Sequence, residues 1–109
     1  MLKIDGNNIY LTRGDSAAIA LEIKNGEADY DFSSDTVKFA VKKNVQDKNK
    51  VIEKTFDENG QIVLTPEDTK TLNFGQYWYD VELQHDNGGT VEVATVIVPS
   101  VFEIGAEVN

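Results

Sequence analysis

The sequence predicts an all-β protein, an antiparallel β-sandwich that forms a single domain over residues 1–109. Apolar and polar side chains alternate with a period of two along several segments, which is typical of strands with one buried and one solvent-facing side. Turn-forming residues separate these segments. A chain of 109 residues that is 40% hydrophobic suits one core and is too short for two ordinary domains.

The alternation is clearest in three segments, 16–24, 36–43 and 76–85. One face of each is apolar, with the sets Ala17, Ile19, Leu21, Ile23; Val37, Phe39, Val41; and Tyr77, Tyr79, Val81, Leu83. β-Branched and aromatic residues, which favour strands, fill these positions. A short strand is also expected in Leu-Lys-Ile at the start of the chain, and the main strands are predicted at 9–12, 16–24, 36–43, 51–56, 61–64, 76–85, 90–98 and 101–104.

Glycine-containing turns connect these strands. Asn-Gly occurs at 25–26, at 59–60 and at 87–88, and Asn-Gly between alternating segments is a strong hairpin signal. One short helical turn is predicted after Thr65, because Pro66 suits a first helical position and Asp68 places an acid in the first turn.

Arg13-Gly14-Asp15 spells an integrin-binding tripeptide, but it lies between two predicted strands. Glycine permits a positive φ, and aspartate bonds readily to the backbone two residues on. Turn formation therefore explains Gly14 and Asp15, and no integrin partner is expected.

Composition excludes several classes of function. The net charge of −9 disfavours nucleic acid as a partner. No cysteine is present, so disulfides and thiolate metal sites are excluded. Neither a signal peptide nor a membrane-spanning segment is expected.

The charge is unevenly distributed. The window 38–54 holds six lysines and two acids, so it carries +4 while the remaining residues carry −13. These lysines protect an edge strand from pairing with other chains, or they form a docking patch.

No catalytic, cofactor or metal site is predicted. The single histidine, His85, lies at a strand end where a solvated residue is expected. The acids Glu27, Asp29, Asp31 and Asp35 lack the order of a calcium-binding loop. No glycine-rich loop precedes a helix. The protein is therefore expected not to be an enzyme.

The segment TLNFGQYWYDVEL carries the pattern Gly75-x-Tyr77-x-Tyr79. Immunoglobulin-like domains often begin strand F in this way, with a tyrosine whose hydroxyl bonds to the backbone upstream. Tyr79 occupies the position of the antibody cysteine, and Phe39 is the best candidate for the central residue of strand C. The predicted fold is therefore an immunoglobulin-like sandwich with a structural corner at Gly75, Tyr77 and Tyr79.

The layout resembles the immunoglobulin-like N-terminal domain of phage baseplate upper proteins. The similarity rests on IYLTRGDSAAIALEI, DTVKFAVKK, LNFGQYWYDVEL and GTVEVATVIVPSVFEI. It implies a virion component that is assembled in the bacterial cytoplasm and contacts other phage structural proteins or itself. Family members continue into longer stalk regions, so this sequence represents a free-standing relative, an accessory protein or an excised domain.

Two alternatives remain. One is a bacterial surface immunoglobulin-like module. The other is a carbohydrate-binding module, in which Trp78 and Tyr10 stack on sugar rings.

Trp78 alternates with the buried tyrosines and should point away from the core. A two-residue turn at Asn87-Gly88 would place it opposite Ile97, and a three-residue loop opposite Val98. The second arrangement is preferred, because it sends Val91, Val93 and Ile97 inward and Glu92 outward. Trp78, Ile97 and Val98 are therefore the candidate partner contact, although a simple cross-strand pair also explains them.

Overall fold

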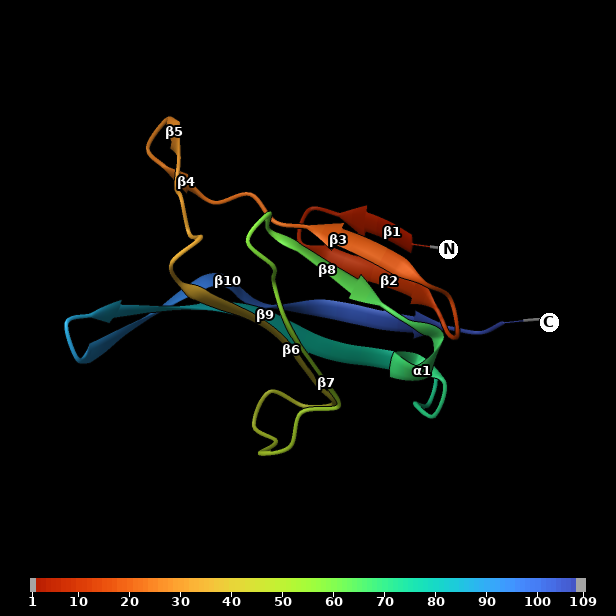
Figure 1. Cartoon of the computed structure of the whole chain (residues 1–109). Coiled ribbons are helices and arrows are strands. Elements are labelled where there is room, and N and C mark those ends of the chain that lie inside the picture. The colour runs from red at the N-terminus through yellow and green to blue at the C-terminus, as the bar shows by residue number, and fades with distance from the viewer. Residues whose placement is uncertain (1, 108–109) are drawn as a thin grey trace.

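A computed structural model describes residues 2–107 (Figure 1) and is built almost entirely from strands. The strands are β1 (Leu2–Asp5), β2 (Asn8–Thr12), β3 (Ala17–Ala20), β4 (Lys24–Asn25), β5 (Ala28–Asp29), β6 (Thr36–Lys42), β7 (Ile52–Thr55), β8 (Gln61–Leu64), β9 (Gly75–Asn87) and β10 (Thr90–Gly105). The helix α1 (Pro66–Thr69) lies between β8 and β9. The predicted all-β class is confirmed.

The strands form one large and two small sheets. The large sheet has the order β1-β2-β10-β9-β6-β7, and its pairs are antiparallel except for β2 and β10, which run parallel. The pair β3–β8 lies over one face of this sheet, and the pair β4–β5 forms a projecting arm (Figure 1). The face turned away from β3–β8 is called the outer face below.

One hydrophobic core fills the space between the large sheet and β3–β8. Phe39 lies at its centre, with its ring centroid 5.2 Å from that of Tyr79 and 6.1 Å from that of Phe102. The alternation predicted this core, because the inward positions of β6 and β9 are buried while the residues between them are not. The buried side chains of the β3–β8 layer are Ala17, Ile19, Ile62 and Leu64.

The expected tyrosine corner hydrogen bond is present at the start of β9. The Tyr77 hydroxyl donates to the carbonyl oxygen of Asn73 at 2.9 Å. Gly75 has φ +129°, a conformation that other residues rarely adopt. The Tyr79 hydroxyl donates to the carbonyl of Asn7. These contacts fix the loop before β9 and the turn before β2 to the same strand.

The helix α1 begins as predicted. The Thr65 N–H donates to the Asp68 carboxylate at 2.7 Å, and Pro66 occupies the first turn. The last residue of α1, Thr69, is fully buried. Its hydroxyl oxygen accepts a hydrogen bond of 2.9 Å from the Gly14 N–H, which joins the helix to the β2–β3 turn.

Three predicted strand boundaries are wrong. The strand expected at 16–24 ends at Ala20, and Lys24 then begins the arm. The arm has its turn at the Asn-Gly signal of 25–26, but its second strand, β5, is not among the predicted strands. The strands expected at 90–98 and 101–104 are one continuous strand, β10. It accommodates two register shifts, between Thr95 and Ile97 and between Ile97 and Ser100, instead of ending there.

The predicted partners of Trp78 are also wrong. Gly88 and Gly89 form the hairpin turn, both with positive φ (67° and 101°), so that Asn87 pairs with Thr90. The turn and the two register shifts together place Trp78 opposite Val101.

Ile97 pairs with Val81 and packs against the core, so the inward orientation expected of it in the preferred arrangement is confirmed and it is not part of a partner contact beside Trp78, whereas Val98 is 64% exposed. The same pairing places Val91 and Val93 opposite Asp86 and Gln84, on the outer face. The inward orientation expected for these two valines is therefore wrong, and so is the outward one expected for Glu92, which lies opposite His85 on the other face.

Candidate functional site

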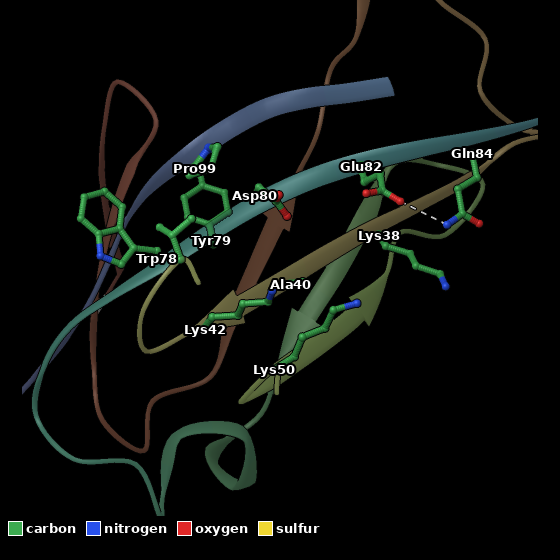
Figure 2. A pocket seen from close by; sticks show the side chains of 11 residues that line it. Lys38, Ala40, Lys42, Lys50, Trp78, Tyr79, Asp80, Glu82, Gln84 and Pro99 are labelled. Carbon is green, nitrogen blue, oxygen red and sulfur yellow. Dashed lines mark hydrogen bonds between the residues drawn. The ribbon is translucent and has the colours of Figure 1, made fainter. Parts of the chain in front are cut away.

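The candidate site is a hollow on the outer face, centred on β6 and β9. It has an apolar end, where Trp78 and Pro99 lie, and a charged end near Lys38 and Gln84 (Figure 2). Its lining residues are Lys38, Ala40, Lys42, Val45, Lys50, Trp78, Tyr79, Asp80, Glu82, Gln84 and Pro99. We call this the Trp78 hollow.

Trp78 reaches the hollow because strand alternation turns it away from the buried Tyr77 and Tyr79. Its outward orientation, predicted from the sequence, is confirmed. The side chain is half-buried, opposite Val101 on one side and Lys42 on the other. Val45, from the β6–β7 loop, also lines the hollow and is 48% exposed. An aromatic surface is thus accessible without being fully solvated.

The lining of the hollow is mildly basic, although the protein is acidic. Lys38, Lys42 and Lys50 line the hollow together with two carboxylates, of Asp80 and Glu82. Register places Lys38 opposite Glu82. The Lys50 ammonium donates to Glu53 at 2.6 Å. This bond raises the Lys50 pKa, and Glu82 and Asp80 add to the increase.

The other three lysines of the basic window do not line the hollow. Lys43 donates to the Gln76 carbonyl at 3.0 Å and lies 4.5 Å from the centroid of the Tyr77 ring. Lys54 forms an ion pair with Asp68 at 3.0 Å. Lys48 is exposed. Three lysines of the window therefore line the hollow, two make contacts within the fold, and Lys48 is exposed.

Tyr10 lies on the same face as Trp78. Tyr10 pairs with Glu103 of β10, and Glu103 pairs with Gln76 of β9. Directly opposite residues share a face of a sheet, and Gln76 and Trp78 are two residues apart on one strand. Both aromatic side chains are half-buried. The outer face therefore carries two partly accessible aromatic side chains, on β2 and β9.

The Arg13-Gly14-Asp15 segment forms the β2–β3 turn and has structural contacts. The Arg13 guanidinium lies 4.1 Å from the centroid of the Phe74 ring, donates to the Leu72 carbonyl at 3.3 Å and pairs with Glu107 at 3.4 Å. Gly14 has φ +84°, and the Asp15 N–H donates to the Thr12 carbonyl at 3.1 Å. These contacts give the three residues structural roles in the turn and its surroundings.

Sequence reasoning missed a buried polar cluster. Asp35 precedes β6 and its side chain is only 2% exposed. One carboxylate oxygen accepts from the Tyr30 hydroxyl and the other contacts His85 Nδ1, both at 2.6 Å. His85 is thus bound to a buried acid rather than simply solvated. Fifty residues separate His85 from Asp35, so no local motif could have revealed the pair.

The acids considered as calcium ligands do not come together. Asp29 pairs with Lys24, and Asp31 accepts from the Ser33 N–H at 3.0 Å. Asp35 is engaged as described above, while Glu27 is exposed. Over residues 2–107 no group of three or more potential ligands is arranged to hold a metal ion. Among the same residues, no helix has the length and apolar character needed to cross a membrane.

Comparison of the chain with protein-family models and with curated proteins finds no match.

Proposed function

We propose that this protein is a non-enzymatic, immunoglobulin-like interaction domain of a phage or prophage tail assembly. The strand order supports the fold. The neighbours β10, β9, β6 and β7 follow the order of strands G, F, C and C′ of variable-type immunoglobulin domains, and β3–β8 corresponds to strands B and E. The Tyr77–Asn73 hydrogen bond matches the corner of strand F.

The observation that carries the interaction role is the Trp78 hollow. Tryptophan is enriched at the energetic centres of protein interfaces, where apolar contact combines with a polar rim. The hollow presents Trp78 with Val45 and Pro99 at one end, Lys42 directly beside Trp78, and two further lysines, Lys38 and Lys50, along the lining. It would suit a structural protein that offers an apolar side chain beside acidic residues. The resemblance to baseplate proteins supplies the assembly context, with a virion component assembled in the bacterial cytoplasm.

The proposal is tested by Trp78→Ala. Phage particles would be induced from the host, purified, and quantified by mass spectrometry for this protein. We expect the wild type in the particles and the variant to be depleted at least tenfold, with a nearly unchanged melting temperature. The matched control is Val63→Ala, because Val63 is 58% exposed but lies on β8, away from the hollow. Absence of the wild type from particles would contradict the phage assignment.

A carbohydrate-binding module is the second candidate, and the shared face of Tyr10 and Trp78 favours it. Aromatic side chains on one face of a sheet provide flat surfaces against which sugar rings pack. A panel of bacterial and host polysaccharides would test this function. It requires binding that Trp78→Ala and Tyr10→Ala each weaken, whereas Val63→Ala does not. If the wild type bound none of the polysaccharides, the assembly role would remain as the supported function.

A further inference from the structure

The strand β10 has a long open edge. Its residues from Thr90 to Ile104 follow β9 on one side. On the other side β2 pairs only with Phe102–Gly105. Within residues 2–107 no strand therefore covers the segment Thr90–Thr95, which lies in the hairpin that projects from the body of the protein (Figure 1). An open edge presents unpaired N–H and C=O groups that can pair with another strand.

Thr90–Thr95 lacks the features that normally protect such an edge. The ladder with β9 is regular there, because both register shifts and Pro99 lie further along β10. The segment TVEVAT contains no lysine or arginine, and its only charge is Glu92. Val91 is 58% exposed and Val93 is 60% exposed. By contrast, the edge strand β7 carries Glu53 and Lys54 and follows Lys50.

The direction of the free backbone groups follows from the hairpin turn. Gly88 and Gly89 both have positive φ, as a type I′ turn requires, so Asn87 and Thr90 form the hydrogen-bonded pair that closes it. Bonded and non-bonded pairs alternate along an antiparallel ladder. Val91, Val93 and Thr95 therefore direct their N–H and C=O groups away from β9.

These positions are self-complementary in one register. Two copies related by a twofold axis at Val93 would pair Val93 with Val93 and Val91 with Thr95. Glu92 would then lie opposite Ala94. If the twofold axis lay at Glu92 instead, Glu92 of one copy would lie opposite Glu92 of the other. Like charges directly opposite each other are destabilising. Charge thus favours the register centred on Val93 over the one centred on Glu92.

We propose that the Thr90–Thr95 edge of β10 is a self-association surface, at which a second copy of this chain adds antiparallel and continues the sheet across the dimer. This surface is distinct from the Trp78 hollow, so the inference does not rest on the proposed function. Because each copy carries a net charge of −9, association must overcome mutual repulsion. It should therefore strengthen as salt screens that repulsion.

The test is analytical ultracentrifugation of the full chain at several concentrations and salt levels. We expect a reversible dimer whose dissociation constant falls with added salt and rises at least tenfold in Val93→Lys, since a lysine on an edge opposes strand addition. The control Val63→Lys changes an equally exposed valine on β8 and should dimerise like the wild type.

A second variant does not depend on disrupting the edge. The natural chain has no cysteine, so Val93→Cys introduces a single thiol that the proposed register brings beside its copy. A short bismaleimide should cross-link it efficiently, and Val63→Cys only weakly. A wild type that stays monomeric up to its solubility limit would overturn the proposal. So would equal cross-linking of the two variants, or a dimer weakened by salt, which would indicate contacts through the lysines instead.

Discussion

His85 Nδ1 lies 2.6 Å from a carboxylate oxygen of Asp35, and this contact joins the projecting part of β9 to the residue that precedes β6. The Asp35 side chain is 2% exposed, whereas that of His85 is 43% exposed. Tyr30 occupies the second carboxylate oxygen. The acid is therefore buried between its two partners, and His85 forms the solvent-facing side of the cluster.

The first prediction concerns the protonation of His85. Its hydrogen bond to Asp35 raises the His85 pKa above the ordinary 6.5, and Glu92 and Asp86 contribute in the same direction. As the only histidine, His85 can be followed by NMR without assignment ambiguity. We expect its imidazole signals to titrate above pH 6.5 in the wild type. In Tyr30→Phe, which leaves the Asp35 contact in place, the pKa should also stay above 6.5.

The second prediction is the dependence of stability on pH. A raised pKa of His85 means that its stabilising contribution is fully present below pH 6.5 and is lost as pH rises through the raised value. The Tyr30 and His85 bonds lower the Asp35 pKa, so that its contribution is lost only as pH falls below the ordinary 3.8. Chemical denaturation should therefore show a larger gap between wild type and His85→Gln at pH 5.5 than at pH 9. A gap independent of pH would contradict this linkage.

The third prediction tests the corner. Tyr77→Phe removes the hydroxyl that donates to the Asn73 carbonyl and changes little else. A typical buried hydrogen bond contributes about 1 kcal/mol, so the free energy of unfolding should fall by about that amount. Tyr10→Phe is the control. Tyr10 is half-buried and its ring contacts Lys3, but its hydroxyl makes no hydrogen bond within the described part of the chain. Equal stability of Tyr77→Phe and the wild type would show that the bond is not stabilising.

Local patterns predicted much of the fold. Alternation located the cores of β6 and β9 and the outward side of Trp78, because in both strands one face is buried and the other is not. The Thr65-Pro66 signal likewise located α1. These features depend on neighbours within a few residues, where sequence and structure are most closely linked.

The register of β10 could not be predicted in the same way. Asn87-Gly88-Gly89 permits several turns, and the run Val96-Ile97-Val98 has no alternation to indicate a bulge. The Trp78 hollow depends on that register for Pro99, and on the β6–β7 loop for Val45. The Tyr30–Asp35–His85 cluster joins segments far apart in sequence. Such long-range contacts follow from packing rather than from local preference.

The fourth prediction is that calcium does not alter stability. The acids near the arm already have other partners, as Asp29 pairs with Lys24 and Asp35 with Tyr30 and His85. Thermal melts in calcium and in a chelator should coincide. A ligand that binds only the native state raises its stability, so a shift of several degrees would reveal a site that the described geometry does not contain.

The last prediction addresses the Arg13-Gly14-Asp15 turn. Gly14 has φ +84°, where a β-branched side chain is strained, and an added Cβ would lie 3.1 Å from the Glu107 carboxylate. Gly14→Val should therefore lower the free energy of unfolding by about 1–3 kcal/mol. The control Gly105→Ala should be tolerated, because Gly105 has no positive φ and the added Cβ would lie 4.0 Å from the atom nearest to it.

Two further variants complete this test of the turn. Thr69→Val removes the buried oxygen that accepts from the Gly14 N–H, and leaving that donor unsatisfied should cost about 1–3 kcal/mol. Asp15→Glu keeps the charge and should leave every binding activity of the protein unchanged. Loss of adhesion to an animal cell receptor in Asp15→Glu, together with normal stability of Gly14→Val, would show that the tripeptide serves recognition and not the turn.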